Sequence, residues 1–290
     1  MKGAALAIVA LLLAGNAPAN DAAVARGAYL ARAGGCHACH KDDGGGGGKV
    51  ATSFGTLIAP NITPDRDHGI GRWREAQFVA AMRYGRAPTG VRYYPGFPYT
   101  AYSGLTDIDL ADLWAYLQAQ APVPRPSPPH ALTFPFDQRI ASLAWQVMFF
   151  VPRPFVADAG RDDVLNRGRY LAEHLLHCRE CHTPRNAFGG MLDSFAYAGN
   201  RDWPAGGTVP NITPDKETGI GSWNENDIVW LLQTGFNPDG NDVQGAMAEL
   251  IEHGSSHLSD ADLRAVAAYV LSLDPIAHEI RREEKTEPFE

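Results

Sequence analysis

Two pentapeptides combine two thiols and an imidazole at a spacing that can hold an iron porphyrin. They are Cys36-His37-Ala38-Cys39-His40 and Cys178-Arg179-Glu180-Cys181-His182. In a C-x-x-C-H motif both thiols can form thioethers to one porphyrin, and the histidine lies under the iron as its proximal ligand. We therefore predict two covalently bound haem c groups: haem 1 on Cys36, Cys39 and His40, and haem 2 on Cys178, Cys181 and His182.

The same four cysteines could instead form disulfides or bind zinc. Zinc ribbons bring their two cysteine pairs much closer in sequence than the 139 residues that separate Cys39 from Cys178. Disulfides account for an even number of cysteines, but not for a histidine directly after both second cysteines. Haem attachment is favoured because the full pattern occurs twice and leaves no cysteine over.

The composition allows a substantial core and carries an excess of acid. Of the 290 residues, 45% are hydrophobic and 20% are charged, which suits one large or two medium domains. The net charge is −8, from 33 acidic and 25 basic residues. This balance argues against nucleic acid as a partner, because phosphate binding needs a basic surface.

Residues 1–19 read as a secretory signal. Lys2 supplies the positive end, residues 4–14 are apolar, and Ala17-Pro18-Ala19 is a small-residue cleavage site. The apolar run is shorter than the roughly 18 to 20 residues that span a bilayer, and no later stretch is long enough. We therefore expect a periplasmic protein that begins near Asn20 and has no stable membrane span.

The elements that must position the two motifs occur twice in the chain. The segment Pro60-Asn61-Ile62-Thr63-Pro64-Asp65 recurs 150 residues later in the chain. The second pentapeptide follows the first by 142 residues, and the Leu-Thr-Asp segment 105–107 recurs as Leu-Ser-Asp 153 residues later. Such a slowly drifting repeat indicates a duplicated unit with one haem in each copy. Apolar periodicity predicts a helix before each motif, a helix at 75–84 with Met82 in the core, and closing helices at 107–118 and 260–273.

The glycines and prolines carry further predictions. Gly27 and Gly168 precede the motifs at nearly the same distance, and we expect helix backbones to approach closely there. The run Gly44–Gly48 is expected to be a mobile surface loop. The proline-rich stretch 121–137 is expected to be stiff and extended, and residues 140–151 are expected to form a helix buried between the domains rather than one on a membrane surface.

With a helix, C-x-x-C-H, a Pro-Asn-Ile turn and a closing helix carrying Leu113, Tyr116 and Leu117, each unit resembles a class I cytochrome c domain. The mature chain is similar to di-haem cytochromes related to the cytochrome subunits of periplasmic alcohol and sugar dehydrogenases, on segments 93–99, 181–186 and 256–263. The resemblance implies an all-α fold of two tandem cytochrome c domains in a pseudo-twofold repeat. We expect a signal peptide at 1–19, domain 1 at 20–121, a linker and connecting helix at 122–160, domain 2 at 161–280 and a charged tail at 281–290.

The resemblance also assigns residues around the haems. It implies that the carbonyls of Pro60 and Pro210 accept the ring N–H of the proximal histidines, and that Trp73 and Trp223 border the haem propionates. It places Met247 as the distal ligand of haem 2, with His253, His257 and Met191 as rivals. The first unit departs from the pattern, because Phe97 and Leu105 stand where related sequences carry methionine. Haem 1 could be five-coordinate or water-ligated, could recruit Met82, His68 or His130, or could use a tyrosine of the 93–102 loop.

These features predict a periplasmic electron carrier rather than an enzyme. The resemblance implies that a periplasmic dehydrogenase supplies the electrons and that a downstream cytochrome or terminal oxidase accepts them. Outside the haem motifs, nothing in the sequence resembles a substrate site. The alternative is a di-haem enzyme of the peroxidase or thiosulfate-oxidising type with its chemistry at haem 1.

Overall fold

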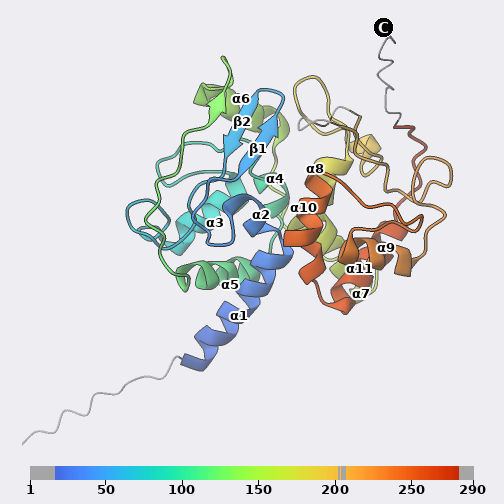
Figure 1. Cartoon of the computed structure of the whole chain (residues 1–290), viewed down its shortest axis with the longest axis horizontal. Helices are drawn as coiled ribbons and strands as arrows, with labels where there is room; N and C mark the ends of the chain where they lie inside the picture. Colours follow the sequence, from blue (N-terminus) through green and yellow to red (C-terminus); the bar gives the residue numbers. More distant parts are fainter. Residues whose placement is uncertain (1–16, 202, 204–206, 281–290) are drawn as a thin grey trace, which may run out of the picture.

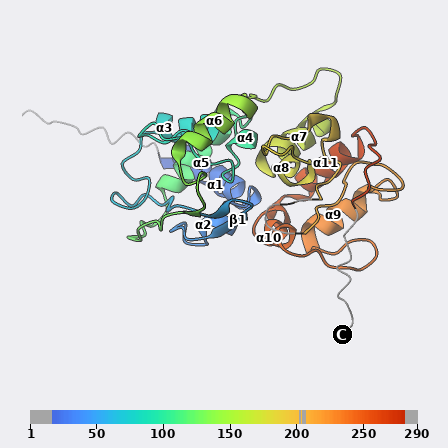
Figure 2. The ribbon, with the colours of Figure 1, turned by 90° about the horizontal axis from the view of Figure 1, so that it is seen from above.

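The computed structural model of the chain describes residues 17–201, 203 and 207–280. Residues 1–16 of the predicted signal at 1–19, and the whole predicted charged tail at 281–290, therefore lie outside the described residues. Two groups of elements lie side by side, one blue to green and one yellow to red (Figures 1 and 2). No helix within the described ranges is both long enough and apolar enough to cross a membrane.

The N-terminal group combines helices with three short strands and ends on a helix that lies over it. Its elements are α1 (Ala17–Ala33), α2 (Cys36–His40), β1 (Lys49–Thr52), β2 (Gly55–Ile58), α3 (Glu75–Tyr84), α4 (Tyr99–Tyr102), α5 (Asp107–Gln118), β3 (Ala131–Leu132) and α6 (Arg139–Phe149).

The C-terminal group is almost entirely helical in the part that the structure describes. Its elements are α7 (Asp163–Tyr170), the π-helical turn η1 (Leu171–Leu175), α8 (Cys178–His182), the 3₁₀ turn η2 (Asp193–Phe195), α9 (Glu225–Thr234), α10 (Ala246–His253), the 3₁₀ turn η3 (Ser255–His257) and α11 (Asp260–Leu271).

Local sequence explains where the closing helices begin. The side chain of Thr106 accepts a hydrogen bond from the backbone N–H of Asp109 at the start of α5, and Ser259 does the same for Asp262 at the start of α11. Acidic residues in both first turns suit the positive end of the helix dipole. The predicted bounds of α3 and α5 are confirmed, whereas α11 ends at Leu271, two residues earlier than predicted.

The opening and closing helices of each group pack through a glycine. A Cβ on Gly27 of α1 would lie 2.0 Å from the carbonyl oxygen of Asp112 in α5. A Cβ on Gly168 of α7 would lie 1.8 Å from the carbonyl oxygen of Ala265 in α11. Both predicted close approaches are therefore confirmed, and each helix pair crosses at a distance that only glycine permits.

The fold is not purely helical, so the all-α prediction is wrong in one place. β1, β2 and β3 form a three-stranded antiparallel sheet in that order, with Val50 paired to Leu57 and Thr56 paired to Ala131. β-Branched residues recur through β1 and β2, which suits a pleated, half-buried surface. β1 and β2 lie between α2 and α3, and β3 lies between α5 and α6, in segments where helical periodicity gave no signal.

The predicted burial of the connecting helix between two domains is also wrong. The side chains that α6 buries are polar: Ser142 donates to the carbonyl of Arg92, and Gln146 donates to the carbonyl of Gly85. Its apolar face is turned outward, with Ile140 69% and Val147 79% exposed. The helix lies over the N-terminal group (Figure 2) and packs on it by these polar contacts, while Trp145 and Phe149 lie against Gly189 and Gly190 of the C-terminal group, so α6 touches both groups without being buried between them.

Two tyrosines join the groups in a reciprocal manner. Tyr29 of α1 donates to Asp262 at 2.6 Å and accepts from the backbone N–H of Ser259 at the start of α11. Tyr170 of α7 donates to Asp109 and accepts from the backbone N–H of Thr106 at the start of α5. Each group thus caps the closing helix of the other.

Candidate haem centres

The cysteines of each pentapeptide lie one helical turn apart. Cys36 and Cys39 are on α2, and Cys178 and Cys181 are on α8, so both thiols of a pair face the same side of a short helix. None of the four forms a disulfide. Each helix follows a residue in the left-handed region of backbone conformation: Gly35 with φ 66° and His177 with φ 46°. This conformation is strained for histidine and not for glycine.

Burial keeps these thiols neutral. It raises the pKa of Cys36, Cys178 and Cys181 to about 12, and it raises the pKa of Cys39 as well. Zinc binds the thiolate, so this environment disfavours a zinc site. Within the described residues, no group of three or more His, Cys, Asp and Glu side chains is placed to hold a metal ion.

The two proximal histidines have the same hydrogen bond. Nδ1 of His40 lies 2.7 Å from the carbonyl oxygen of Pro60, and Nδ1 of His182 lies 2.8 Å from that of Pro210. Because a carbonyl only accepts, each Nδ1 carries the proton and each Nε2 keeps a free lone pair. Burial lowers the pKa of both imidazoles, although the carbonyl contacts oppose this. Neutral, oriented imidazoles with a free Nε2 fit an axial position on haem iron.

An asparagine fixes the turn that supplies each carbonyl. The side-chain oxygen of Asn61 accepts from the N–H and hydroxyl of Thr63, and its amide donates to the carbonyl of Val123. Asn211 repeats the arrangement with Thr213 and with the carbonyl of Ile276. Both asparagines are buried. The segment that follows each closing helix therefore holds the carbonyl in place under the imidazole.

The glycine run beside haem motif 1 is packed, and the prediction of a mobile surface loop is wrong. The N–H of Gly46 donates to the carbonyl of His40, and that of Gly47 donates to Ala59. A Cβ on Gly48 would lie 1.9 Å from the carbonyl oxygen of Cys39. Side chains are absent because the backbone passes against α2 and against the Pro60 turn, where there is no room for them.

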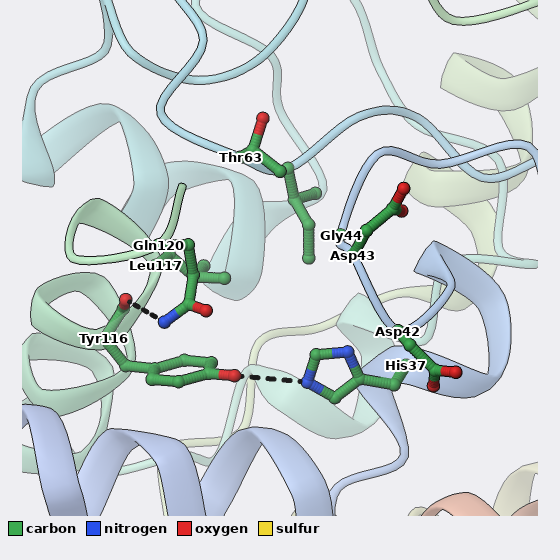
Figure 3. Close-up of a pocket in the computed structure, with 9 residues that line it drawn as sticks. His37, Asp42, Asp43, Gly44, Thr63, Tyr116, Leu117 and Gln120 are labelled. Carbon is green, nitrogen blue, oxygen red and sulfur yellow. Dashed lines mark hydrogen bonds between the residues drawn. The ribbon is translucent and has the colours of Figure 1, made fainter. Parts of the chain in front are cut away.

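His37 lies inside the first motif but is occupied elsewhere. Its Nδ1 donates to the carbonyl of Lys41, and its Nε2 accepts from the hydroxyl of Tyr116 at 3.3 Å. Figure 3 shows the ring directed toward Tyr116, in a small pocket also lined by Asp42, Asp43 and Gln120. Both nitrogens are used, so His37 holds the loop against α5.

The remaining predicted residues lie where the repeat requires, and their roles toward haem stay predictions. Trp73 and Trp223 are half-buried against the core, each with its backbone N–H bonded to the isoleucine three residues earlier. Met247 lies in the first turn of α10, also against the core. Met82, on α3, is buried in the hydrophobic core, as predicted.

Sequence reasoning missed the contacts between the two motifs. Glu180, inside α8, is buried; it accepts from Thr100 of α4 and pairs with Arg185 at 2.6 Å. Tyr102 of α4 is buried, and its ring lies 5.9 Å from that of His177. In the other direction, α10 packs on α2. Pairing Tyr29 with Tyr170 at the repeat offset was the one available signal for this interface.

Comparison with known proteins agrees with this geometry. The cytochrome c family matches residues 24–121. The chain is 42% identical to a diheme c-type cytochrome of Cereibacter sphaeroides over 84% of each chain. It is 40% identical to a fructose dehydrogenase cytochrome subunit of Gluconobacter japonicus, over 89% of this chain and 54% of that one. It is 39% identical to a gluconate 2-dehydrogenase cytochrome c subunit of Pantoea cypripedii, over 88% and 60%.

The chain thus spans most of the first relative and little more than half of the two subunits. Its family match, its identity over most of the diheme relative, and two C-x-x-C-H helices with oriented histidines all agree. The chain belongs to the cytochrome c family, in the group of di-haem c-type cytochromes and cytochrome subunits of dehydrogenases.

Proposed function

We propose that this protein is a periplasmic di-haem cytochrome c that receives electrons from a dehydrogenase and passes them to a downstream cytochrome or terminal oxidase. The observation that carries the proposal is the repeated site, in which a C-x-x-C-H helix and a proline carbonyl orient a neutral imidazole twice in one chain. The proposed architecture is two cytochrome c domains, 20–121 and 161–280, joined through residues 122–160.

Haem iron, when bound, supplies one-electron redox chemistry. The chain's residues attach, orient and bury it. Cys36 and Cys39 would anchor haem 1, and Cys178 and Cys181 would anchor haem 2. Pro60 and Pro210 hold each histidine ring at a fixed angle and raise its basicity, so little has to move when the charge changes.

The packing of the motifs supports transfer between the haems. A Cβ on Gly34, just before α2, would lie 3.0 Å from Leu175, just before α8. Tyr102 lies between the groups. Burial raises the pKa of its phenol, and Cys36 and Cys39 of one group and Glu180 of the other are near enough to raise it further. Since electron transfer falls steeply with distance, an arrangement that brings the two motifs to one interface favours a relay.

A dehydrogenase partner is supported by the relatives, two of which are named as cytochrome subunits of fructose and gluconate dehydrogenases. The alternative of a di-haem peroxidase or thiosulfate-oxidising enzyme is not favoured, because the relatives described above are named as cytochromes or cytochrome subunits.

The test is to produce the protein in a periplasm that matures c-type cytochromes. We expect two covalent haems per chain by mass, two one-electron steps in a redox titration, and reduction by a membrane fraction supplied with fructose, gluconate or an alcohol. The C36S/C39S and C178S/C181S variants should each lose one haem. A colourless protein, or two haems that no such fraction reduces, would contradict the proposal.

A further inference from the structure

We propose that haem 1 has no side-chain ligand on its distal face, and that this face binds a small neutral diatomic ligand such as carbon monoxide or nitric oxide. This inference rests on the proposed function, because it presupposes that haem c is attached at Cys36 and Cys39. It concerns the chain's own departure from its internal repeat.

The segments expected on the distal side of the two haems, residues 93–97 and 243–247, have matching backbone hydrogen bonds. The N–H of Tyr93 donates to the carbonyl of Gly85, and the N–H of Val243 donates to that of Gly235, both at 2.8 Å. The bridges Arg86↔Arg92 and Phe236↔Asp242 and the turns at 87–90 and 237–240 are likewise related by 150 residues. Four residues after the aligned pair, haem 2 has Met247 and haem 1 has Phe97. A phenyl ring cannot ligate iron.

The methionine side chains of the N-terminal group in the described residues do not lie in this segment. Met82 is buried in the core of α3, at the position that Leu232 occupies in α9. Both side chains are 7% exposed, so Met82 fills the same core space that a leucine fills in the repeat. Met148 lies on the outward face of α6 and is 60% exposed. Neither is placed to replace the missing methionine.

The imidazoles of the same group are also unsuitable. Nδ1 of His130 accepts from the N–H of Ile58 at 3.1 Å, so its Nε2 carries the proton and has no lone pair for iron. His68 pairs with Asp65 in the turn that follows Pro60, on the side of the proximal ligand. His37 uses both nitrogens, as described above.

Two imidazoles approach from the C-terminal group. His174 donates from Nδ1 to the carbonyl of Ala101, and its ring is enclosed by Gly104, Phe155 and Tyr170. His177 is the stronger rival, because its ring faces Tyr102. It directly precedes Cys178, however, and its backbone is fixed at the start of the haem 2 motif. A variant can therefore test it without disturbing the haem 1 segment.

The surroundings of Phe97 define the ligand class. The rings in contact with it are those of Tyr93, Tyr99 and Tyr102, with centroids 5.6 to 6.4 Å away. A Cβ on the neighbouring Gly96 would meet Leu57, a buried side chain. Burial raises the pKa of Tyr93 to about 12 and raises the pKa of Tyr99 and Tyr102 as well, so these phenols stay protonated and are poor ligands for iron. A distal segment of neutral side chains favours a neutral ligand of ferrous haem over an anion that would need a charge partner.

The experiment titrates the ferrous, two-haem protein with carbon monoxide and counts bound ligand by the Soret change against total haem iron. We expect one carbon monoxide for every two haems. F97M should abolish this binding and add a second ferric methionine-ligation band. F97L, which changes size but supplies no ligand atom, should keep the wild-type stoichiometry. H177G, which suits the positive φ of that residue, should also keep it.

Each other result overturns the inference. A wild-type protein with two haems and reversible redox steps that binds no carbon monoxide has a distal ligand at haem 1, although the proposed electron carrier would stand. Binding that F97M leaves unchanged belongs to haem 2. Binding that appears only in H177G identifies His177 as the ligand. Absence of covalent haem contradicts the proposed function itself, so the two failures are distinguishable.

Discussion

Replacing Gly27 by alanine tests the helix crossing that positions haem motif 1. The added Cβ would lie 2.0 Å from the carbonyl oxygen and 2.7 Å from the Cβ of Tyr116. That carbonyl belongs to Asp112 in the middle of α5, so it cannot rotate away. To restore an ordinary contact, α1 and α5 must separate by about 1 Å, which loosens the contacts along both helices.

The magnitude follows from two opposing effects. Overpacking in a well-packed core costs about 1–3 kcal/mol, and the upper end applies here because the clash is with backbone. Alanine gains about 1 kcal/mol over glycine in a helix. We expect G27A to lower the free energy of unfolding by about 2 kcal/mol, or roughly 30-fold in the unfolding equilibrium constant.

The assay is chemical denaturation of the haem-loaded protein, followed by far-ultraviolet circular dichroism. G168A, whose Cβ would lie 1.8 Å from a carbonyl oxygen, should behave alike. The control is A25G at an exposed position of α1, which should cost only the helix preference of about 1 kcal/mol. If G27A is as stable as wild type or more so, the close crossing does not constrain the fold and the reasoning fails.

Three further predictions concern the contacts between the two groups. Y29F and Y170F should each cost about 1–3 kcal/mol in denaturation, because each leaves a carboxylate without its phenol donor; unchanged midpoints would show that these bonds contribute nothing. Burial alone would raise the pKa of Asp262, but hydrogen bonds from Arg167 and Tyr29 outweigh it and hold the pKa below the ordinary value. Its contribution to stability is therefore complete above the ordinary aspartate pKa of about 3.9 and is lost as pH falls through the lower folded value; D262N should flatten the acid limb of the stability profile, and an identical limb would refute this. E180A should cost about 1–3 kcal/mol, because it removes the buried carboxylate that pairs with the half-buried Arg185 and accepts from Thr100, and leaves the guanidinium only backbone carbonyl acceptors. E180Q should retain part of that stability; equal loss in both variants would point to lost packing alone.

The parts of the fold that sequence could predict are those in which a pattern has one physical meaning. Apolar spacing located α3 and α5 to the residue, and acidic residues in the first turn of α5 agree with where that helix begins. The close helix contacts at Gly27 and Gly168 could be predicted because a glycine in the middle of an apolar helix lowers helix stability, and a close approach of a second backbone is a reason for it to be there.

The features that were missed depend on tertiary contact. A run of five glycines has the same composition whether it is mobile or pressed against α2, and only the carbonyls of His40 and Ala59 decide between them. The apolar residues of α6 suggested burial, but Ser142 and Gln146 bind the backbone of the N-terminal group and turn that face outward. Likewise, the motif located the iron ligands, while the pairing of Glu180 with Thr100 could not be read from either segment alone.

The two tyrosine contacts have the form of an isologous interface, in which the same patch serves both partners. Tyr29 meets the start of α11 as Tyr170 meets the start of α5, and the residues involved recur at the offsets of the internal repeat. Within one polypeptide, the two groups therefore contact each other in the manner of two protomers of a symmetric homodimer. Each closing helix begins against a tyrosine of the opposite group, so loosening one group exposes the start of the other group's closing helix.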